Sequence, residues 1–289
     1  MQITRKSLFE SATLQIGLVA ARPRSDACGD VERQNRNAVV LPLAGVFAKH
    51  DASGRQAIGT PSHAVFVAAD TPYRISFPGT IGDRALILRF GNELAPDRVD
   101  RCGDAALASN GLLPAPAMIL RNLLGTRLGQ GEIDDFEIEI LGLDLLNVSF
   151  DAMRKEKPDL RPSALTRRTR AMERVKEAIA TAPSRKWNVA RLAKLANLSP
   201  FHLCHVFRQM AGTSIYDYVL QERLAYALDA VLDGGADLTS IALDAGFASH
   251  SHFTARFRSF FGCTPAALRR TASAARLADL RKIVTARPH

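Results

Sequence analysis

The chain has 289 residues, of which 47% are hydrophobic and 23% charged, and it carries a formal net charge of +9. This length and composition suit two packed domains and exclude a disordered or fibrous chain. The basic surplus lies in residues 166–289, which carry a net charge of +10, whereas residues 1–165 carry −1. Such asymmetry favours a polyanion as partner of the C-terminal half over a merely soluble basic surface.

No segment predicts a membrane span or a secretory leader. The apolar run Ile16–Ala21 follows Arg5 and Lys6, but it is short and Glu10 precedes it, so it predicts a first strand instead of a signal peptide. The four cysteines are widely spaced and form no CxxC pair, which favours a reduced, cytoplasmic protein without a disulfide framework: Cys28, Cys102, Cys204 and Cys263.

Short β-type runs bounded by turn signals occupy the first hundred residues. They are Val39–Phe47, Ala64–Ala68, Tyr73–Phe77 and Ala85–Phe90. Closely spaced strands without intervening helices indicate a sandwich or barrel.

Two helices are predicted after a loop at Ala95–Pro116, at about Ala117–Leu128 and Glu132–Lys155. The second helix carries two apolar stripes at helical spacing. One stripe contains Ile138, Leu141, Leu145 and Val148, and the other contains Ile133, Phe136, Ile140, Leu143, Asn147 and Phe150. We expect the second stripe to pair with the same helix of another subunit, with Asn147 setting the register. The alternative is a helix wedged entirely within its own domain.

The polar, proline-containing segment 157–165 predicts an interdomain linker, with a new helix beginning near Thr166. The expected domains are therefore 1–156, a β-rich domain with helices, and 166–270, an all-α domain. Residues 271–289 form a C-terminal tail without a distinct signal.

The C-terminal domain contains an internal repeat. Ser199–Phe207 aligns with Ser249–Phe257 at a constant offset, and Leu192-Ala193 aligns with Ile241-Ala242. Ser199 and Ser249 are placed to cap the helices that follow them. Each copy therefore predicts a helix-turn-helix unit.

Helical periodicity separates the inner and outer faces of both repeated helices. The inner residues are Leu203, Phe207 and Met210 in the first copy and Phe253, Phe257 and Phe260 in the second. The outer residues are Phe201, Cys204, His205 and Arg208 in the first copy and His250, Ser251, Thr254, Ala255 and Arg258 in the second.

The spaced residues of both copies resemble the DNA-binding domain of AraC/XylS-type transcription regulators. They include Trp187, Leu192-Ala193, Gly212-Thr213-Ser214, Arg223-Leu224, Gly246-Phe247, Phe257-Arg258, Gly262-Cys263-Thr264-Pro265 and Arg269. The resemblance covers about residues 166–270. It implies two helix-turn-helix subdomains joined by one long helix, about Ile215–Leu232, that holds two recognition helices one DNA turn apart.

Residue roles follow from the resemblance. Base contacts are expected from Phe201, Cys204, His205, His250, Ser251, Thr254 and Ala255, and phosphate contacts from Arg208, Arg256 and Arg258. His205 departs from the arginine common at its position, and Ala255 from a long polar side chain. Because Ala255 can offer only apolar contact, the second half-site should be recognised less strictly. His202 and His252 lie beside core residues and are expected to be structural or to contact the DNA backbone.

Residues 1–156 also resemble, more weakly, the cupin-like sensing domain of the same family. The cupin metal motif is missing. The groups His202-Cys204-His205 and His250-His252 lie on separate helices, and neighbours two positions apart face different ways, so neither a metal nor another cofactor is expected. Candidate effector-binding residues are Arg33, His50, Tyr73 and Arg74.

These features together predict a cytoplasmic transcription regulator, not an enzyme. Its expected partners are double-stranded DNA, RNA polymerase, a small-molecule effector and a second copy of the chain, and activation is the expected sign of regulation. Two alternatives remain open: an architectural or partner-controlled DNA binder without a ligand, and a cupin-like enzyme with an adventitious DNA-binding tail.

Overall fold

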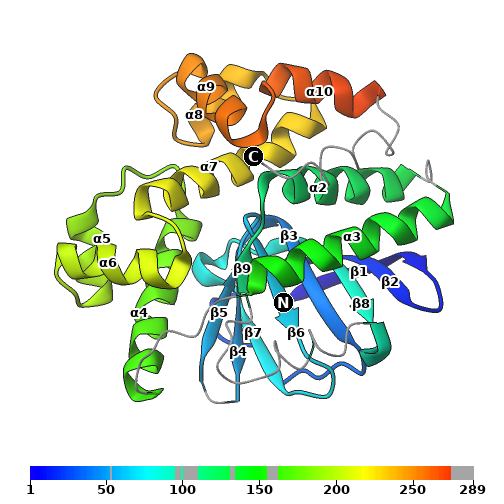
Figure 1. The fold of residues 1–289 in the computed structure, drawn as a ribbon, viewed down its shortest axis with the longest axis horizontal. Coiled ribbons are helices and arrows are strands. Elements are labelled where there is room, and N and C mark those ends of the chain that lie inside the picture. The colour runs from blue at the N-terminus through cyan, green and yellow to red at the C-terminus, as the bar shows by residue number, and fades with distance from the viewer. Residues whose placement is uncertain (53, 95–98, 100–109, 131–133, 155–161, 275–289) are drawn as a thin grey trace.

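The computed structural model describes residues 1–52, 54–94, 99, 110–130, 134–154 and 162–274. Its N-terminal half contains two antiparallel sheets (Figure 1). The larger sheet has the strand order β1-β2-β8-β3-β6-β9 and the smaller one has the order β5-β4-β7. The strands are β1 Gln2–Glu10, β2 Leu14–Arg22, β3 Asn37–Gly45, β4 Phe47–Asp51, β5 Gln56–Gly59, β6 His63–Val67, β7 Tyr73–Ser76, β8 Asp83–Phe90 and β9 Asn110–Leu112.

The two sheets face each other across a small apolar cluster. Ala21 of β2 and Val65 of β6 are buried there against Phe47 of β4 and Phe77, which follows β7. Because side chains alternate between the faces of a strand, the opposite face of the larger sheet needs a separate cover. Helices α2 (Ala115–Gln130) and α3 (Asp135–Met153) supply that cover and complete the main core.

The C-terminal half is helical among the described residues. Its helices are α4 Pro162–Thr181, α5 Val189–Ala196, α6 Pro200–Ala211, α7 Ile215–Asp233, α8 Leu238–Asp244, α9 His250–Phe261 and α10 Pro265–Ala274. Figure 1 shows α7 as a long diagonal helix with α5 and α6 beside one end and α8 to α10 along the other half. None of the described helices combines the length and the apolar character needed to cross a bilayer.

The two halves share one apolar core. Leu224 and Leu228 of α7 and Phe253 of α9 belong to the same buried cluster as Leu141 of α3 and Leu86 of β8. The joining helix is therefore buried on the side that faces the sheets as well as on the sides that face the helix-turn-helix units. Tyr216, near the N-terminus of this helix, is 61% exposed.

Several predicted boundaries shift. The expected strand Val39–Phe47 is two strands, because the chain bends at Gly45, where φ is +78°. A Cβ at Gly45 would lie 2.1 Å from the carbonyl oxygen of Gly82, so glycine allows this close approach. Strands β1 and β5 were not predicted, and β9 lies in the segment expected to be a loop.

Helix α4 begins at Pro162, inside the predicted linker and earlier than the expected start near Thr166. The rest of that linker, 157–161, lies outside the described residues, as do most of the predicted tail and the two ends of the predicted helix Glu132–Lys155. Within α3, Asp134 caps the N-terminus by accepting hydrogen bonds from the backbone N–H groups of Phe136, at 2.8 Å, and Glu137.

Candidate nucleic-acid interface

Helix α6 presents the predicted outer residues to solvent. Ser199 caps the helix, its hydroxyl accepting from the backbone N–H of His202 at 3.2 Å, and Pro200 occupies the first turn. Leu203 and Phe207 are fully buried on the inner face. On the outer face Phe201 is 85% exposed, and Cys204, His205 and Arg208 are exposed beside it. An exposed phenylalanine of this kind is available for an apolar contact with a partner.

Helix α9 repeats this arrangement. Ser249 accepts a hydrogen bond from the backbone N–H of His252 at 3.2 Å, and Phe253 and Phe257 are buried. The outer residues His250, Ser251, Ala255 and Arg258 are exposed and Thr254 is half-buried. Phe260, expected on the inner face, is only partly buried; Phe261 takes the core position instead. The helix therefore buries Phe253, Phe257 and Phe261 at a strict i, i+4 spacing.

The arginines of the repeat divide into two groups. Arg208, Arg256 and Arg258 are exposed near the outer faces, and the Arg256 guanidinium also donates to the Tyr216 hydroxyl at 3.4 Å. By contrast, Arg223 and Arg269 are structural.

Arg223 donates from Nε to the carbonyl of Pro183 at 2.8 Å, and Arg269 donates from Nε to the carbonyl of Val231 at 3.0 Å. Each lies on the helix that follows an outer-face helix, and each fixes the chain leading into its own helix-turn-helix unit. The repeat therefore extends to these two arginine contacts.

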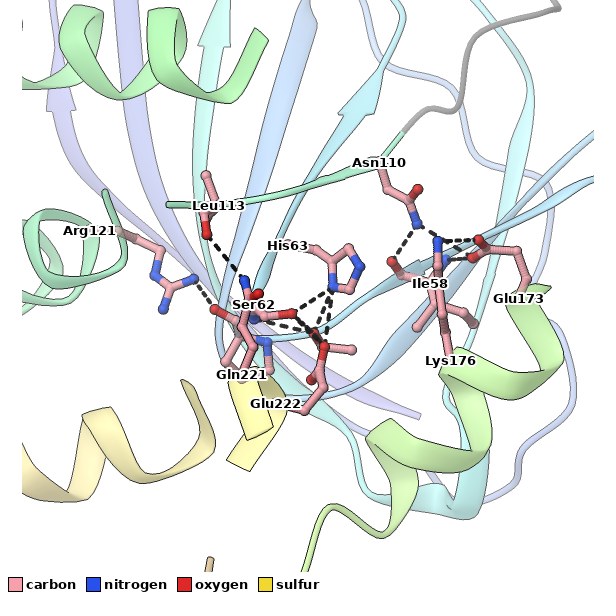
Figure 2. Close-up of polar contacts among 12 residues, drawn as sticks. Ile58, Ser62, His63, Asn110, Leu113, Arg121, Glu173, Lys176, Gln221 and Glu222 are labelled. Carbon is pink, nitrogen blue, oxygen red and sulfur yellow. Dashed lines mark hydrogen bonds and ion pairs between the residues drawn. The ribbon is translucent and has the colours of Figure 1, made fainter. Parts of the chain in front are cut away.

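A buried polar cluster joins the sheets to α7 (Figure 2). Glu222 of α7 accepts hydrogen bonds from the hydroxyls of Thr60, at 3.0 Å, and Ser62, and its carboxylate lies 3.6 Å from Nδ1 of His63. Burial raises the pKa of the Glu222 carboxyl, while the hydroxyl hydrogen bonds oppose that rise. The segment between β5 and β6 therefore holds the middle of the joining helix.

Further contacts extend this interface in both directions. Two helical turns beyond Glu222, Asp229 accepts a hydrogen bond from the Arg84 guanidinium at 2.6 Å. On α4, Glu173 accepts from the backbone N–H of Ile58 at 2.8 Å and from Lys176 at 2.6 Å. Glutamates of both α4 and α7 thus bind the same edge of the N-terminal half (Figure 2).

A cavity of about 110 Å³ lies between the two sheets. Its apolar lining includes Val19, Val40, Phe47, Ile75, Phe77 and Ile87, and its polar lining includes Arg5, Glu32, Gln34, Tyr73, Asp83 and Arg89. A mostly apolar wall with a few polar groups is typical of a small-molecule site.

Of the four predicted effector-binding residues, only Tyr73 lines this cavity. Arg33 and Arg74 are exposed, and His50 lies opposite Arg74 in the smaller sheet, where its Nε2 contacts the Ser76 hydroxyl at 2.8 Å. Because side chains alternate along β7, Arg74 points away from the face that Tyr73 shares with the cavity. Arg5, Asp83 and Arg89 were not among the predicted effector-binding residues. A signal for two of them was present in β8, where the residues on one face of the strand begin with Asp83 and end with Arg89.

Comparison with known proteins identifies the C-terminal region. Residues 192–271 match the helix-turn-helix domain family. The HTH-type transcriptional regulator GlxA of Rhizobium meliloti (strain 1021) is 35% identical over 100 residues, which is 35% of this chain and 31% of that protein. The virulence regulon transcriptional activator VirF of Yersinia enterocolitica is 32% identical over 85 residues, covering 29% and 31% of the two chains.

The XylDLEGF operon transcriptional activator of Pseudomonas putida is 35% identical over 98 residues, covering 33% of this chain and 30% of that protein. The chain thus spans about a third of the length of these curated relatives. Among solved structures, ToxT from Vibrio cholerae O395 aligns over 94% of this chain and 97% of its own, with 12% identity and a TM-score of 0.36. The C-terminal region is accordingly a helix-turn-helix domain of the AraC type, and its relatives are transcription regulators.

Proposed function

We propose that this protein is a transcription regulator that binds double-stranded DNA through the outer faces of α6 and α9. The observation that carries this proposal is the duplicated, capped helix with an exposed polar and aromatic outer face, within a half of the chain that carries a net charge of +10. Exposed side chains on a recognition helix contact base edges in the major groove, and nearby arginines contact phosphates.

Specificity at the first half-site is assigned to Phe201, Cys204 and His205. The Phe201 ring suits a thymine methyl group, and the His205 imidazole can donate to or accept from a purine edge. His250, Ser251, Thr254 and Ala255 contact the second half-site, where Ala255 offers only apolar contact. Arg208, Arg256 and Arg258 contact phosphates, with Arg256 placed by its hydrogen bond to Tyr216.

Genome-wide mapping of bound sites followed by gel shifts on the recovered sequences tests this function. We expect a recurring sequence with two half-sites about one helical turn apart and an affinity that falls steeply with salt. Binding that is equal on recovered and scrambled sequences would instead identify an architectural DNA binder.

Regulation is assigned to a small molecule bound in the cavity between the sheets. The cavity belongs to the same half of the chain as Thr60, Ser62 and His63, which bind Glu222, and this cluster reaches α6 through ring contacts. His63 packs edge-on against Tyr218 at 5.9 Å between ring centroids, and Tyr218 packs against the inner-face Phe207 at 5.3 Å. A ligand that alters the packing of the sheets would bias how α7 holds the two outer faces and how the bound protein contacts RNA polymerase, with activation as the expected result.

The second apolar stripe of α3 supports the proposed homodimer. Phe136 is 71% exposed, Ile140 and Leu143 are half-buried, and Asn147 is exposed, whereas Ile138, Leu141 and Leu145 of the other stripe are buried. Phe150, expected in the exposed stripe, is instead buried in the main core and is not part of the proposed dimer face. Ile133 of the same stripe lies outside the described residues. A helix that already uses one stripe for its own core has the second available for an identical helix.

A further inference from the structure

One strand sets the chemistry of the cavity between the sheets. In β8 the residues Asp83, Ala85, Ile87 and Arg89 alternate with Leu86, Leu88 and Phe90, which are buried in the core beneath α2 and α3. Asp83, Ala85, Ile87 and Arg89 all line the cavity. A single strand therefore places a carboxylate at one end of the cavity wall and a guanidinium at the other, with two apolar residues between them.

The guanidinium end has an excess of positive charge. Arg89 and Arg5 both line it, and Glu32 is the acid beside them; burial, and to a smaller extent the charge of Arg5, lowers the pKa of Arg89. Glu32 accepts a hydrogen bond from the Tyr73 hydroxyl at 3.3 Å. Within the described part of the chain neither Arg5 nor Arg89 forms an ion pair, so this end suits an incoming anion.

The Arg89 guanidinium lies over Gly17 of β2. A Cβ at Gly17 would lie 3.4 Å from Nη1 of Arg89 and 3.3 Å from the carbonyl oxygen of Lys6. Gly17 pairs with Ile87 across the β2–β8 ladder, so the Arg89 side chain leans back along the strand toward the middle of the cavity. The charge at this end therefore lies nearer to Asp83 than the positions of the backbone alone suggest.

At the opposite end of the cavity lies Asp83, a carboxylic acid for which the described residues supply no ion-pair partner. Asp83 lies near the aromatic wall formed by Phe47 and Phe77, and burial raises the pKa of its carboxyl to about 7. Among the described residues the Asp83 carboxyl has neither a hydrogen-bond donor nor an ion-pair partner. A half-buried carboxyl in that situation has only partial access to water and gains from a donor that enters the cavity.

The spacing of the two ends limits the ligand. Four residues of strand separate Asp83 from the level of Ile87, a distance of roughly 13 Å. Subtracting a hydrogen bond at each end leaves roughly 7 to 8 Å between the terminal groups of a ligand. The cavity volume of about 110 Å³ is smaller than the ~150 Å³ of a cavity that holds benzene, so the body of the ligand is limited to about the size of a short aliphatic chain.

We infer that the effector is a small organic acid with two polar ends. Its carboxylate binds Arg5 and Arg89, its apolar body lies between Phe47 and Ile87, and a hydroxyl or ammonium group at its far end donates to Asp83. This inference rests on the proposal that the cavity is the effector site, and it adds the chemical class of the effector.

Matched probes on the full-length protein test the inference. We would titrate 6-hydroxyhexanoate, 6-aminohexanoate and hexanoate into the wild-type protein and into Asp83→Ala, Arg89→Gln and Arg74→Gln, using calorimetry. The donor-bearing acids should bind the wild type about tenfold more tightly than hexanoate, because each completes a hydrogen bond to the half-buried Asp83 carboxyl. Asp83→Ala should abolish that preference, and Arg89→Gln should weaken the binding of all three acids. Arg74→Gln, outside the cavity, should change neither the preference nor the binding affinities.

Two outcomes would overturn the inference. If hexanoate binds as tightly as the other acids, or if the preference survives in Asp83→Ala, Asp83 does not recognise the ligand, although an effector site at Arg89 would stand. If none of the probes binds at millimolar concentration, the proposed ligand class is wrong. Gel shifts with the same protein preparations test the DNA-binding function separately, so a failure of that function can be distinguished from a failure of the ligand inference.

Discussion

In the proposed function, some outer-face residues of α6 and α9 recognise bases and others bind phosphates through their charge. His205 is exposed on α6 and suited to a base edge, whereas Arg258 is exposed at the C-terminal end of α9 and suited to a phosphate. Residues with these two roles should respond differently to a change of DNA sequence.

His205→Ala should relax the preference at one base position, costing about 1–3 kcal/mol on the preferred sequence and little on others. Arg258→Ala should weaken binding on every sequence and reduce the salt slope by about one. Fluorescence anisotropy across a set of operator variants and salt concentrations measures both effects. An identical loss for the two variants on all sequences would refute the division of roles.

Asp83 gives a prediction about pH. Its pKa is 3.8 in the unfolded chain and about 7 in the folded one, so the folded protein binds more protons between these values. The contribution of Asp83 to the free energy of unfolding is therefore most favourable below about pH 4 and declines as the pH rises toward 7. Urea titrations of the wild type and Asp83→Asn at pH 5 and pH 8 should show that only the wild type carries this decline; parallel changes in the two proteins would contradict it.

At this scale the sequence predicted some residues well and others poorly. The caps Ser199 and Ser249 and the inner residues Phe207 and Phe257 follow from local helical spacing, which the sequence displays directly. The cavity residues depend on which strands face each other, and that pairing joins residues far apart in the chain. Only Tyr73 was found there by its residue type.

Among the elements, α7 connects the two halves of the molecule. Glu222 and Asp229 lie seven residues apart and therefore on one face of the helix, where Thr60 and Arg84 of the N-terminal half bind them. The family resemblance implied a helix at about Ile215–Leu232, close to the observed α7, which is capped at its C-terminus by Gly234, where φ is +78°. It did not predict the docking, because a buried glutamate in a helix resembles a solvent-facing one until its partners are known.

Glu222→Ala should uncouple DNA binding from the effector. The change removes the acceptor of the Thr60 and Ser62 hydroxyls, which weakens the attachment of α7 to the sheets and lowers the free energy of unfolding by about 1–3 kcal/mol. Effector should still bind the variant, as followed by calorimetry, but should no longer alter its affinity for DNA. Tyr226→Ala, an exposed position on the same helix, serves as the control; an unchanged effector response in Glu222→Ala would exclude this route.

The exposed stripe of α3 predicts the oligomeric state. Phe136→Glu combined with Ile140→Lys places charges on the proposed dimer face while leaving the buried residues Leu141 and Leu145 unchanged. Sedimentation at micromolar concentration should then show a dimer for the wild type and a monomer for the variant, with equal helix content. A wild-type monomer would show that α3 does not pair.

At the scale of the whole molecule, the sequence predicted a β-rich N-terminal half and a helical C-terminal half, because strand and helix periodicities are local. It treated the halves as separate domains joined by a linker, whereas the described residues of both share one apolar core. That core arises because Leu224 and Leu228 cover the sheet side of α7, and such two-sided burial can be assigned only when the neighbours are known.

Because the two halves share this core, we expect regulation to depend on how tightly the sheets bind the DNA-binding half of the chain. A molecule whose halves are joined by Glu222, Asp229 and Glu173 can change the placement of α6 and α9 only by adjusting or releasing those contacts. The proposed effector contacts the face of the larger sheet that lines the cavity, whereas α7 packs on the side of the opposite face.

Hydroxyl-radical footprinting of the full-length protein on a recovered site tests the central proposal most directly. Two recognition helices on one protein should protect two short windows about one helical turn apart on the same face of the duplex, and His205→Ala should weaken only one of the windows. A single protected window, or two windows on opposite faces of the DNA, would contradict the proposal that α6 and α9 together bind successive major grooves.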